Sequence, residues 1–154
     1  MKIKKQVIFT VFLCLFIFIS INNIYSQHAP KEYNPFVLAD FRHSLEYIMA
    51  GEYAKAILSC NNVIKADPNS VVSYTIRARA YYELNEYDKA IADCNQAIKL
   101  DKNNATAYNI RGNSYGKKGD YKRAISDWQS AVRLNPNLEE AKYNIELAMK
   151  QQDN

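Results

Sequence analysis

Apolar and small side chains recur with a fixed spacing of 34 residues through most of the chain. Residues 71–104 and 105–138 align without a gap, and a weaker copy precedes them at 37–70. The positions shared by the second and third copies are Tyr81 and Tyr115, Tyr87 and Tyr121, Ala90 and Ala124, Ile91 and Ile125, Asp93 and Asp127, and Leu100 and Leu134. Self-similarity at a fixed period of this length is typical of a solenoid, in which each copy packs only against its neighbours.

Within each copy the apolar spacing is helical twice, with a polar break between the two stretches at residues 50–52, 84–86 and 118–120. The pattern therefore predicts a helix pair per copy, with helices at about 71–84 and 87–100 in the second. Asn and Gly at the breaks are suited to the left-handed conformation that ends a helix.

Residues 139–150 predict one further helix, which would cap the array, and residues 151–154 are expected to fray. The pattern thus predicts an all-α protein, an α-solenoid of three helix pairs and a C-terminal capping helix. Three groups of recurring residues are expected to pack it: Ala56, Ala90 and Ala124 for close helix approach, Tyr47, Tyr81 and Tyr115 beside them, and Tyr53, Tyr87 and Tyr121 at the turns.

The first 26 residues follow a different pattern. Three lysines lead into the apolar run 7–21, and no basic cluster follows it. This favours a signal peptide cleaved after Ser26 over a retained membrane anchor, because the run is shorter than the ~20 residues of a bilayer-spanning helix. We expect an exported protein, periplasmic, envelope-associated or secreted, with residues 27–36 as a flexible lead-in.

Removal of residues 1–26 lowers the net charge of the chain. The full chain has 20 basic and 16 acidic residues, and the segment contains three lysines and no acids, so the charge falls from +4 to 17 − 16 = +1. A nearly neutral chain is a poor ligand for phosphate backbones, and nucleic acid is not an expected partner.

No residue pattern indicates catalysis, a metal or a cofactor. His28 lies in the lead-in, His43 has no Asp or Cys at ligand spacing, and no glycine-rich phosphate loop is present. Cys60 and Cys94 occupy equivalent places in neighbouring copies, roughly a helix diameter (~10 Å) apart, which is too far for a disulfide. We expect both to be buried thiols.

The third copy has Tyr108, Gly112, Tyr115, Ala124, Trp128 and Pro136 at the offsets of a known signature, and the chain resembles the tetratricopeptide repeat family. The first copy departs from the signature, with Asp40 and Ser44 where an aromatic and a small residue are expected. The resemblance implies a superhelix whose first helices line a groove that binds peptides or proteins.

By this resemblance, positions 2, 5, 6, 9, 12 and 13 of each copy face the groove; among them are Ile76 and Ile110. The polar candidates for peptide binding are Thr75, Arg79, Tyr82, Asn109, Asn113, Lys117, Tyr143 and Asn144. Some family members hold a C-terminal carboxylate with Lys and Asn in one copy, but Phe41 and Leu45 stand at the matching positions here. A free acidic C-terminus is therefore not the expected ligand.

An apolar stripe, Leu38, Phe41, Leu45 and Ile48, lies at helical spacing in the first copy. Two interpretations are open: the stripe contacts a partner, or the helix is rotated, burying the stripe against the second copy and leaving Asp40, His43 and Ser44 outside. The leading functional hypothesis is a non-enzymatic adaptor or scaffold that binds a protein or peptide. The alternative is a structural subunit that oligomerises through the stripe without a separate ligand.

Overall fold

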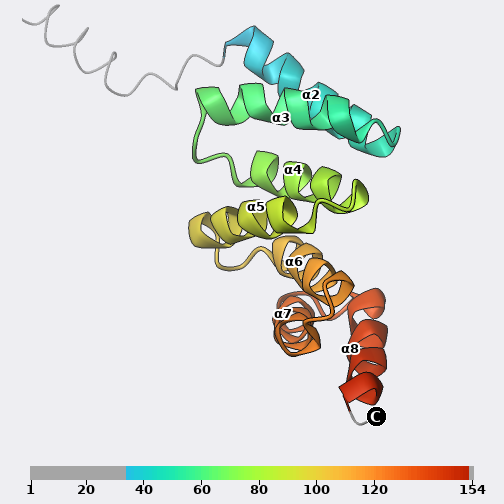
Figure 1. Ribbon diagram of the computed structural model, residues 1–154. Helices are drawn as coiled ribbons and strands as arrows, with labels where there is room; N and C mark the ends of the chain where they lie inside the picture. Colours follow the sequence, from blue (N-terminus) through green and yellow to red (C-terminus); the bar gives the residue numbers. More distant parts are fainter. Residues whose placement is uncertain (1–33, 153–154) are drawn as a thin grey trace, which may run out of the picture. The chain divides into compact units, whose positions relative to one another are not determined.

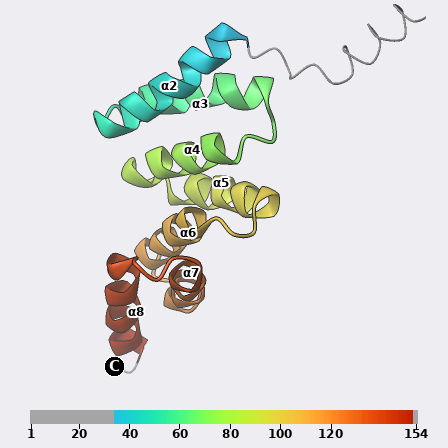
Figure 2. The same cartoon turned by 180° about the vertical axis from the view of Figure 1, so that it is seen from behind.

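The computed structural model describes residues 34–152, and these residues contain helices and no strands. The helices are α2 (Pro35–Met49), α3 (Tyr53–Ala66), α4 (Val71–Glu83), α5 (Tyr87–Leu100), α6 (Ala105–Lys117), α7 (Tyr121–Leu134) and α8 (Glu139–Gln152). They stack in chain order from α2 to α8 (Figures 1 and 2). Each pair packs together, and the second helix of one pair packs on the first helix of the next. The predicted all-α solenoid of three helix pairs and a final helix is confirmed.

The turn inside each pair uses the left-handed backbone that the sequence predicted. Gly51, Asn85 and Gly119 have φ of 74°, 61° and 79°. In each copy the amide that follows this residue returns to a carbonyl of the first helix, as Glu86 N–H does to the Tyr81 carbonyl at 2.8 Å. One residue per turn therefore ends the first helix and starts the chain back along it.

Two predicted boundaries need correction. The structure begins α2 at Pro35, so the last two residues of the expected lead-in are helical. At the other end α8 continues to Gln152, two residues beyond the predicted helix 139–150, and the expected fraying of residues 151–154 stays a prediction. The predicted signal peptide at 1–26 lies outside the described residues, and across residues 34–152 each helix is too short or too polar to span a bilayer.

Small side chains allow the helices to approach closely. Ala56, Ala90 and Ala124 are fully buried, as expected for the positions where the paired helices come together. Cys60 and Cys94 are also fully buried, with free thiols, and burial raises the pKa of the Cys60 thiol to about 11. Both thiols therefore remain protonated packing groups.

An arginine in the first helix joins each of the later copies to the copy before it. Arg77 donates two hydrogen bonds to Asp93 of its own pair, both at 2.7 Å, and a third to Asn61 of the preceding pair at 2.6 Å. Arg111 repeats this arrangement with Asp127 at 2.7 Å and Asn95 at 2.6 Å. We call these two arginine-centred sets the Arg–Asp–Asn ladder.

The ladder gives Asp93 and Asp127 their role. Their side chains are only 9% and 8% exposed, and each accepts a fork of two bonds from arginine. The aspartate paired with each arginine raises the pKa of that arginine above the usual value for arginine. These aspartates are therefore ion-pair partners within the core and not solvated surface residues.

The ends of the array carry acidic side chains where the interior carries small ones. Glu46 of α2 stands where Ala80 and Ser114 are buried, and Glu146 of α8 stands where Ala78 and Gly112 are buried. Both glutamates are exposed. An additional helix packed against either end would cover a carboxylate, which would need a partner there.

Replacing Arg111 with alanine tests the ladder. The change leaves the Asp127 carboxylate buried without its partner, and we expect the free energy of unfolding to fall by about 3 kcal/mol. The measurement is urea denaturation followed by circular dichroism. Lys118→Ala is the matched control, because Lys118 pairs with the 85% exposed Asp88, and it should have no resolvable effect. Equal losses in the two variants would contradict the role given to the ladder.

Candidate functional site

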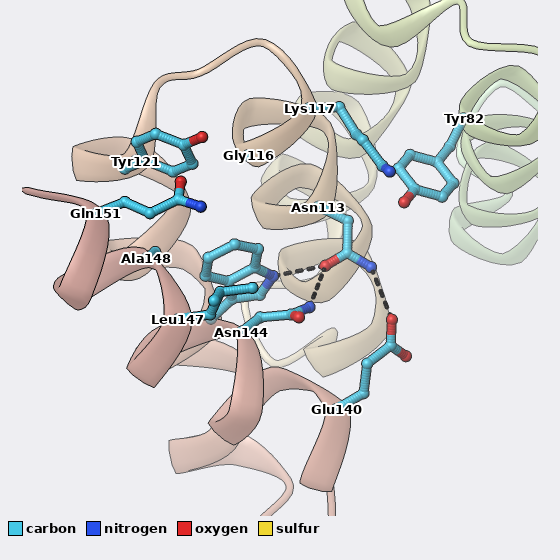
Figure 3. A pocket seen from close by; sticks show the side chains of 11 residues that line it. Tyr82, Asn113, Gly116, Lys117, Tyr121, Glu140, Asn144, Leu147, Ala148 and Gln151 are labelled. Carbon is cyan, nitrogen blue, oxygen red and sulfur yellow. Dashed lines mark hydrogen bonds between the residues drawn. The ribbon is translucent and has the colours of Figure 1, made fainter.

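A pocket of about 460 Å³ opens between α4, α6 and α8 (Figure 3). Its walls are Tyr82 from α4, Asn113, Gly116 and Lys117 from α6, Tyr121 and Trp128 from α7, and Glu140, Asn144, Leu147, Ala148 and Gln151 from α8. Alternate helices of the stack thus share one cavity, the arrangement expected of a groove lined by first helices. The volume lies within the range of ligand sites, ~300–1,000 Å³.

Asn113 is the polar centre of the pocket. Its Oδ1 accepts hydrogen bonds from Trp128 Nε1 at 2.6 Å and from Asn144 Nδ2 at 3.3 Å, and its Nδ2 donates to Glu140 Oε1 at 3.5 Å (Figure 3). The side chain is only 9% exposed. Asn113 therefore fixes α8 against α6 and α7, and its oxygen is already engaged by internal donors.

Trp128 depends on two glycines of α6. It stands where the earlier copies have Cys60 and Cys94, and a Cβ at Gly112 would lie 2.7 Å from Trp128 Cδ1. A Cβ at Gly116 would lie 3.0 Å from Trp128 Cη2. In the third copy a large residue on α7 therefore replaces the small one of the earlier copies. The facing helix α6 has glycine at two positions, which leaves room for the ring.

One cation and one anion flank this centre. Lys117 is exposed on α6 and points toward Tyr82, and Glu140 is exposed on α8, where it faces Asn113 (Figure 3). Burial raises the pKa of the Tyr82 phenol, and its hydroxyl is able to donate a hydrogen bond. The pocket combines aromatic rings with a balanced polar rim.

Four of the eight predicted polar groove residues line this pocket, namely Tyr82, Asn113, Lys117 and Asn144. Thr75 and Arg79 do not, and both have internal partners: Thr75 Oγ1 donates to the Val71 carbonyl and accepts from Asn104 Nδ2, and Arg79 pairs with Glu83 at 2.6 Å. A ligand would have to compete with these contacts. Asn104 also caps α6, because its side chain accepts a hydrogen bond from the Ala107 amide.

The remaining predicted residues differ in their surroundings. Asn109 Oδ1 is buried and has no hydrogen-bond partner among the described residues, whereas Tyr143 is 64% exposed on α8 and does not line the pocket. Ile76 and Ile110, which the resemblance placed toward the groove, are 8% and 3% exposed and belong to the core.

The first-copy stripe is partly open. Leu38 and Leu45 are 56% and 40% exposed, whereas Phe41 and Ile48 are half-buried. Ser44 is fully buried, and its hydroxyl donates to the Phe41 carbonyl at 2.7 Å. The expectation that a rotated helix leaves Ser44 outside is therefore wrong, because Ser44 fills the small-residue position.

Sequence reasoning did not identify Glu140, Trp128, Tyr121 and Gln151 as pocket residues. Three of them lie at positions that the repeat assigns to packing or to the end of the chain. The signal available in the sequence was Gly116, since it stands where the earlier copies have Ile48 and Tyr82. No cluster of His, Cys, Asp or Glu within residues 34–152 is arranged to hold a metal ion.

Comparisons with known proteins agree with this architecture. Models described as tetratricopeptide repeat match residues 59–92 and 105–138, and one described as TPR repeat matches 78–119. Residues 59–138 are therefore similar to tetratricopeptide repeats. No curated protein sequence matches the chain.

Solved structures of the same fold are similar in size. The first TPR of Spaghetti (RPAP3) bound to the HSP90 peptide SRMEEVD is 28% identical, with a TM-score of 0.74, covering 77% of this chain and 94% of that one. The Arabidopsis OM64 TPR domain is 27% identical, with a TM-score of 0.72 and coverage of 74% and 94%. The second TPR domain of human RPAP3 in complex with the HSP70 peptide SGPTIEEVD is 25% identical, with a TM-score of 0.69 and coverage of 74% and 95%.

A pair of asparagine variants tests the polar centre. Asn113→Ala leaves the buried Trp128 N–H without an acceptor, and we expect a loss of about 2 kcal/mol in the free energy of unfolding. Asn109→Ala is the matched control on the same helix, where the lost oxygen has no partner, and its effect should stay within about 0.5 kcal/mol. Thermal denaturation of the two variants, compared with wild type, gives both values. A larger loss in Asn109→Ala would refute this assignment.

Proposed function

We propose that the protein is an exported, non-enzymatic adaptor that binds a peptide or protein segment on the face formed by its first helices. The observation that carries the proposal is the pocket shared by α4, α6 and α8. Its polar residues Asn113 and Lys117 differ from the residues at the same positions of the other copies, whereas the packing alanines Ala56, Ala90 and Ala124 recur. A variable surface on a constant scaffold is the arrangement that gives a repeat protein its specificity.

Similar structures support the class of ligand. Two of them hold the acidic peptides SRMEEVD and SGPTIEEVD. This chain has Phe41 and the exposed Leu45 at the positions where some family members hold a carboxylate, and Glu140 adds a negative charge to the pocket. The proposed ligand is therefore an internal segment without a free acidic C-terminus.

The proposed location rests on the sequence alone. The basic and apolar pattern of residues 1–26 supports export, and the near-neutral charge that remains after its removal suits a protein that recognises other proteins. We propose that the protein acts in the periplasm or cell envelope, or outside the cell.

Selection from a random peptide display library tests the binding activity. Protein purified after expression of the full chain should enrich a set of related peptides. Leu147→Asp, which puts a charge in the pocket wall, should weaken the enriched peptides at least roughly tenfold in a fluorescence binding assay. Leu134→Asp is the matched control, since Leu134 is similarly exposed, 37% against 45%, and does not line the pocket. Failure to enrich any peptide, or equal weakening by the two variants, would contradict the proposal.

The exposed part of the stripe favours a second candidate, a subunit that oligomerises through Leu38 and Leu45. The leading proposal expects a monomer at micromolar concentration in sedimentation velocity. If the wild type is instead a dimer that Leu38→Ala with Leu45→Ala dissociates, the second candidate replaces it. Leu58→Ala is the control, because Leu58 is 63% exposed on α3, outside the stripe, and should leave the sedimentation coefficient unchanged.

A further inference from the structure

At one position in the first helix of each copy, the first two copies have a large side chain and the third has none. Position 12 is Ile48 in the first copy, Tyr82 in the second and Gly116 in the third. Glycine inside a helix costs about 0.5–1 kcal/mol relative to alanine, and Gly116 does not have the left-handed backbone that would call for it. The missing side chain therefore has another cause.

The cause is Trp128. Its ring lies so close to α6 that a Cβ on Gly116 would be 3.0 Å from Cη2 and 3.3 Å from Cζ2. A side chain at position 116 would therefore be in tight contact with the ring, which would have to shift to admit it. The pocket over Gly116 thus stays open as a direct result of packing in the third copy.

The second copy shows what normally occupies this space. The Tyr82 ring packs against the cluster of Ala78, Cys94 and Ile110, and its centroid lies 5.8 Å from that of Tyr87 at an interplanar angle of 54°. This tilted contact is a favoured geometry for aromatic pairs. The residue equivalent to Tyr87 in the third copy is Tyr121, and it lines the pocket without a ring from position 12 beside it.

The rest of the pocket suits an aromatic guest. Leu147 of α8 is 45% exposed and gives the pocket an apolar wall together with Tyr121. Most of the other exposed lining is polar: Gln151 lies beside Tyr121, and Lys117 and Glu140 lie on the side of Tyr82 (Figure 3). An aromatic ring would enter between the apolar walls, and the backbone on either side of it would meet the polar rim.

We infer that the pocket over Gly116 is a subsite for an aromatic side chain of the bound segment, which takes the place that Tyr82 fills in the second copy. The inference rests on the proposed peptide binding and specifies its chemistry. Affinity for the segment would then come mainly from this ring, since a buried aromatic anchor is a common centre of binding energy.

The sequence provides its own reporter. Trp128 is the only tryptophan, so its indole N–H gives a single nuclear magnetic resonance signal from the wall of the pocket. Titration with N-acetyl-phenylalaninamide should shift this signal with millimolar affinity, and N-acetyl-alaninamide should not. An unchanged indole signal at millimolar N-acetyl-phenylalaninamide, or equal shifts with the two amides, would overturn the inference.

A tyrosine introduced on α8, either at the pocket or away from it, gives a matched pair of variants that tests the subsite. Gln151→Tyr places a ring at the pocket rim, from where it competes with the guest, and should weaken the N-acetyl-phenylalaninamide titration roughly tenfold. Met149→Tyr adds the same ring at a 43% exposed position of α8 that does not line the pocket, and should leave the titration unchanged. Equal effects of the two variants would count against the subsite.

The peptides selected from the library separate the two proposals. If peptides bind at the pocket but carry no common aromatic residue, and Gln151→Tyr does not weaken them, the subsite is refuted and peptide binding stands. If the amide probe binds as expected but no peptide is enriched, the pocket accepts an aromatic group and the proposed adaptor function fails. Enriched peptides with a shared aromatic residue and sensitivity to Gln151→Tyr support both.

Discussion

The forked pairing of an arginine with a buried aspartate fixes the geometry on which the array depends. Arg77 and Arg111 each hold their own helix pair closed through two short bonds and reach back to an asparagine of the preceding pair. Within a pair the fork is directional, and a buried charge left without its partner is costly, so the fork fixes how the two helices of that pair align. Between pairs the ladder adds one directional hydrogen bond, from Arg77 to Asn61 and from Arg111 to Asn95. This bond adds to the packing contacts that align successive first helices.

The third copy differs from the others in the sizes of the side chains that pack its two helices together. Trp128 takes the place of a cysteine, and Gly112 and Gly116 make room for it. The indole then reaches Asn113, and through Asn113 the contact extends to Asn144 and Glu140 of α8. Trp128, in the core of the third helix pair, is thus connected to the pocket through Asn113. Asn113 also holds α8 in place.

Much of the fold follows from the sequence because its causes are local or periodic. The helix pairs come from apolar spacing, and the turns from Gly51, Asn85 and Gly119. The pocket is harder to foresee, since Asn113 owes its partners to α7 and α8, whose approach depends on the size of Trp128. Thr75 and Arg79 were correctly placed on a first helix, but the polar groups that engage them, Asn104 and Glu83, follow no periodic pattern. For Ser44 the place in the repeat was informative and the residue type was not. Its burial follows from its position, although a serine there departs from the family pattern.

The ladder also bears on how such an array changes in length. A copy added beyond Glu46 or Glu146 would cover a carboxylate, which would then need a partner. A tandem duplication of residues 71–104, in contrast, would bring its own arginine and aspartate and would present Asn95 to the arginine of the new copy, as Asn61 does for Arg77. Every interior junction would be satisfied without any compensating substitution. The middle copy is therefore the genetic unit by which this array can lengthen, and insertion there would leave the pocket at its C-terminal end intact.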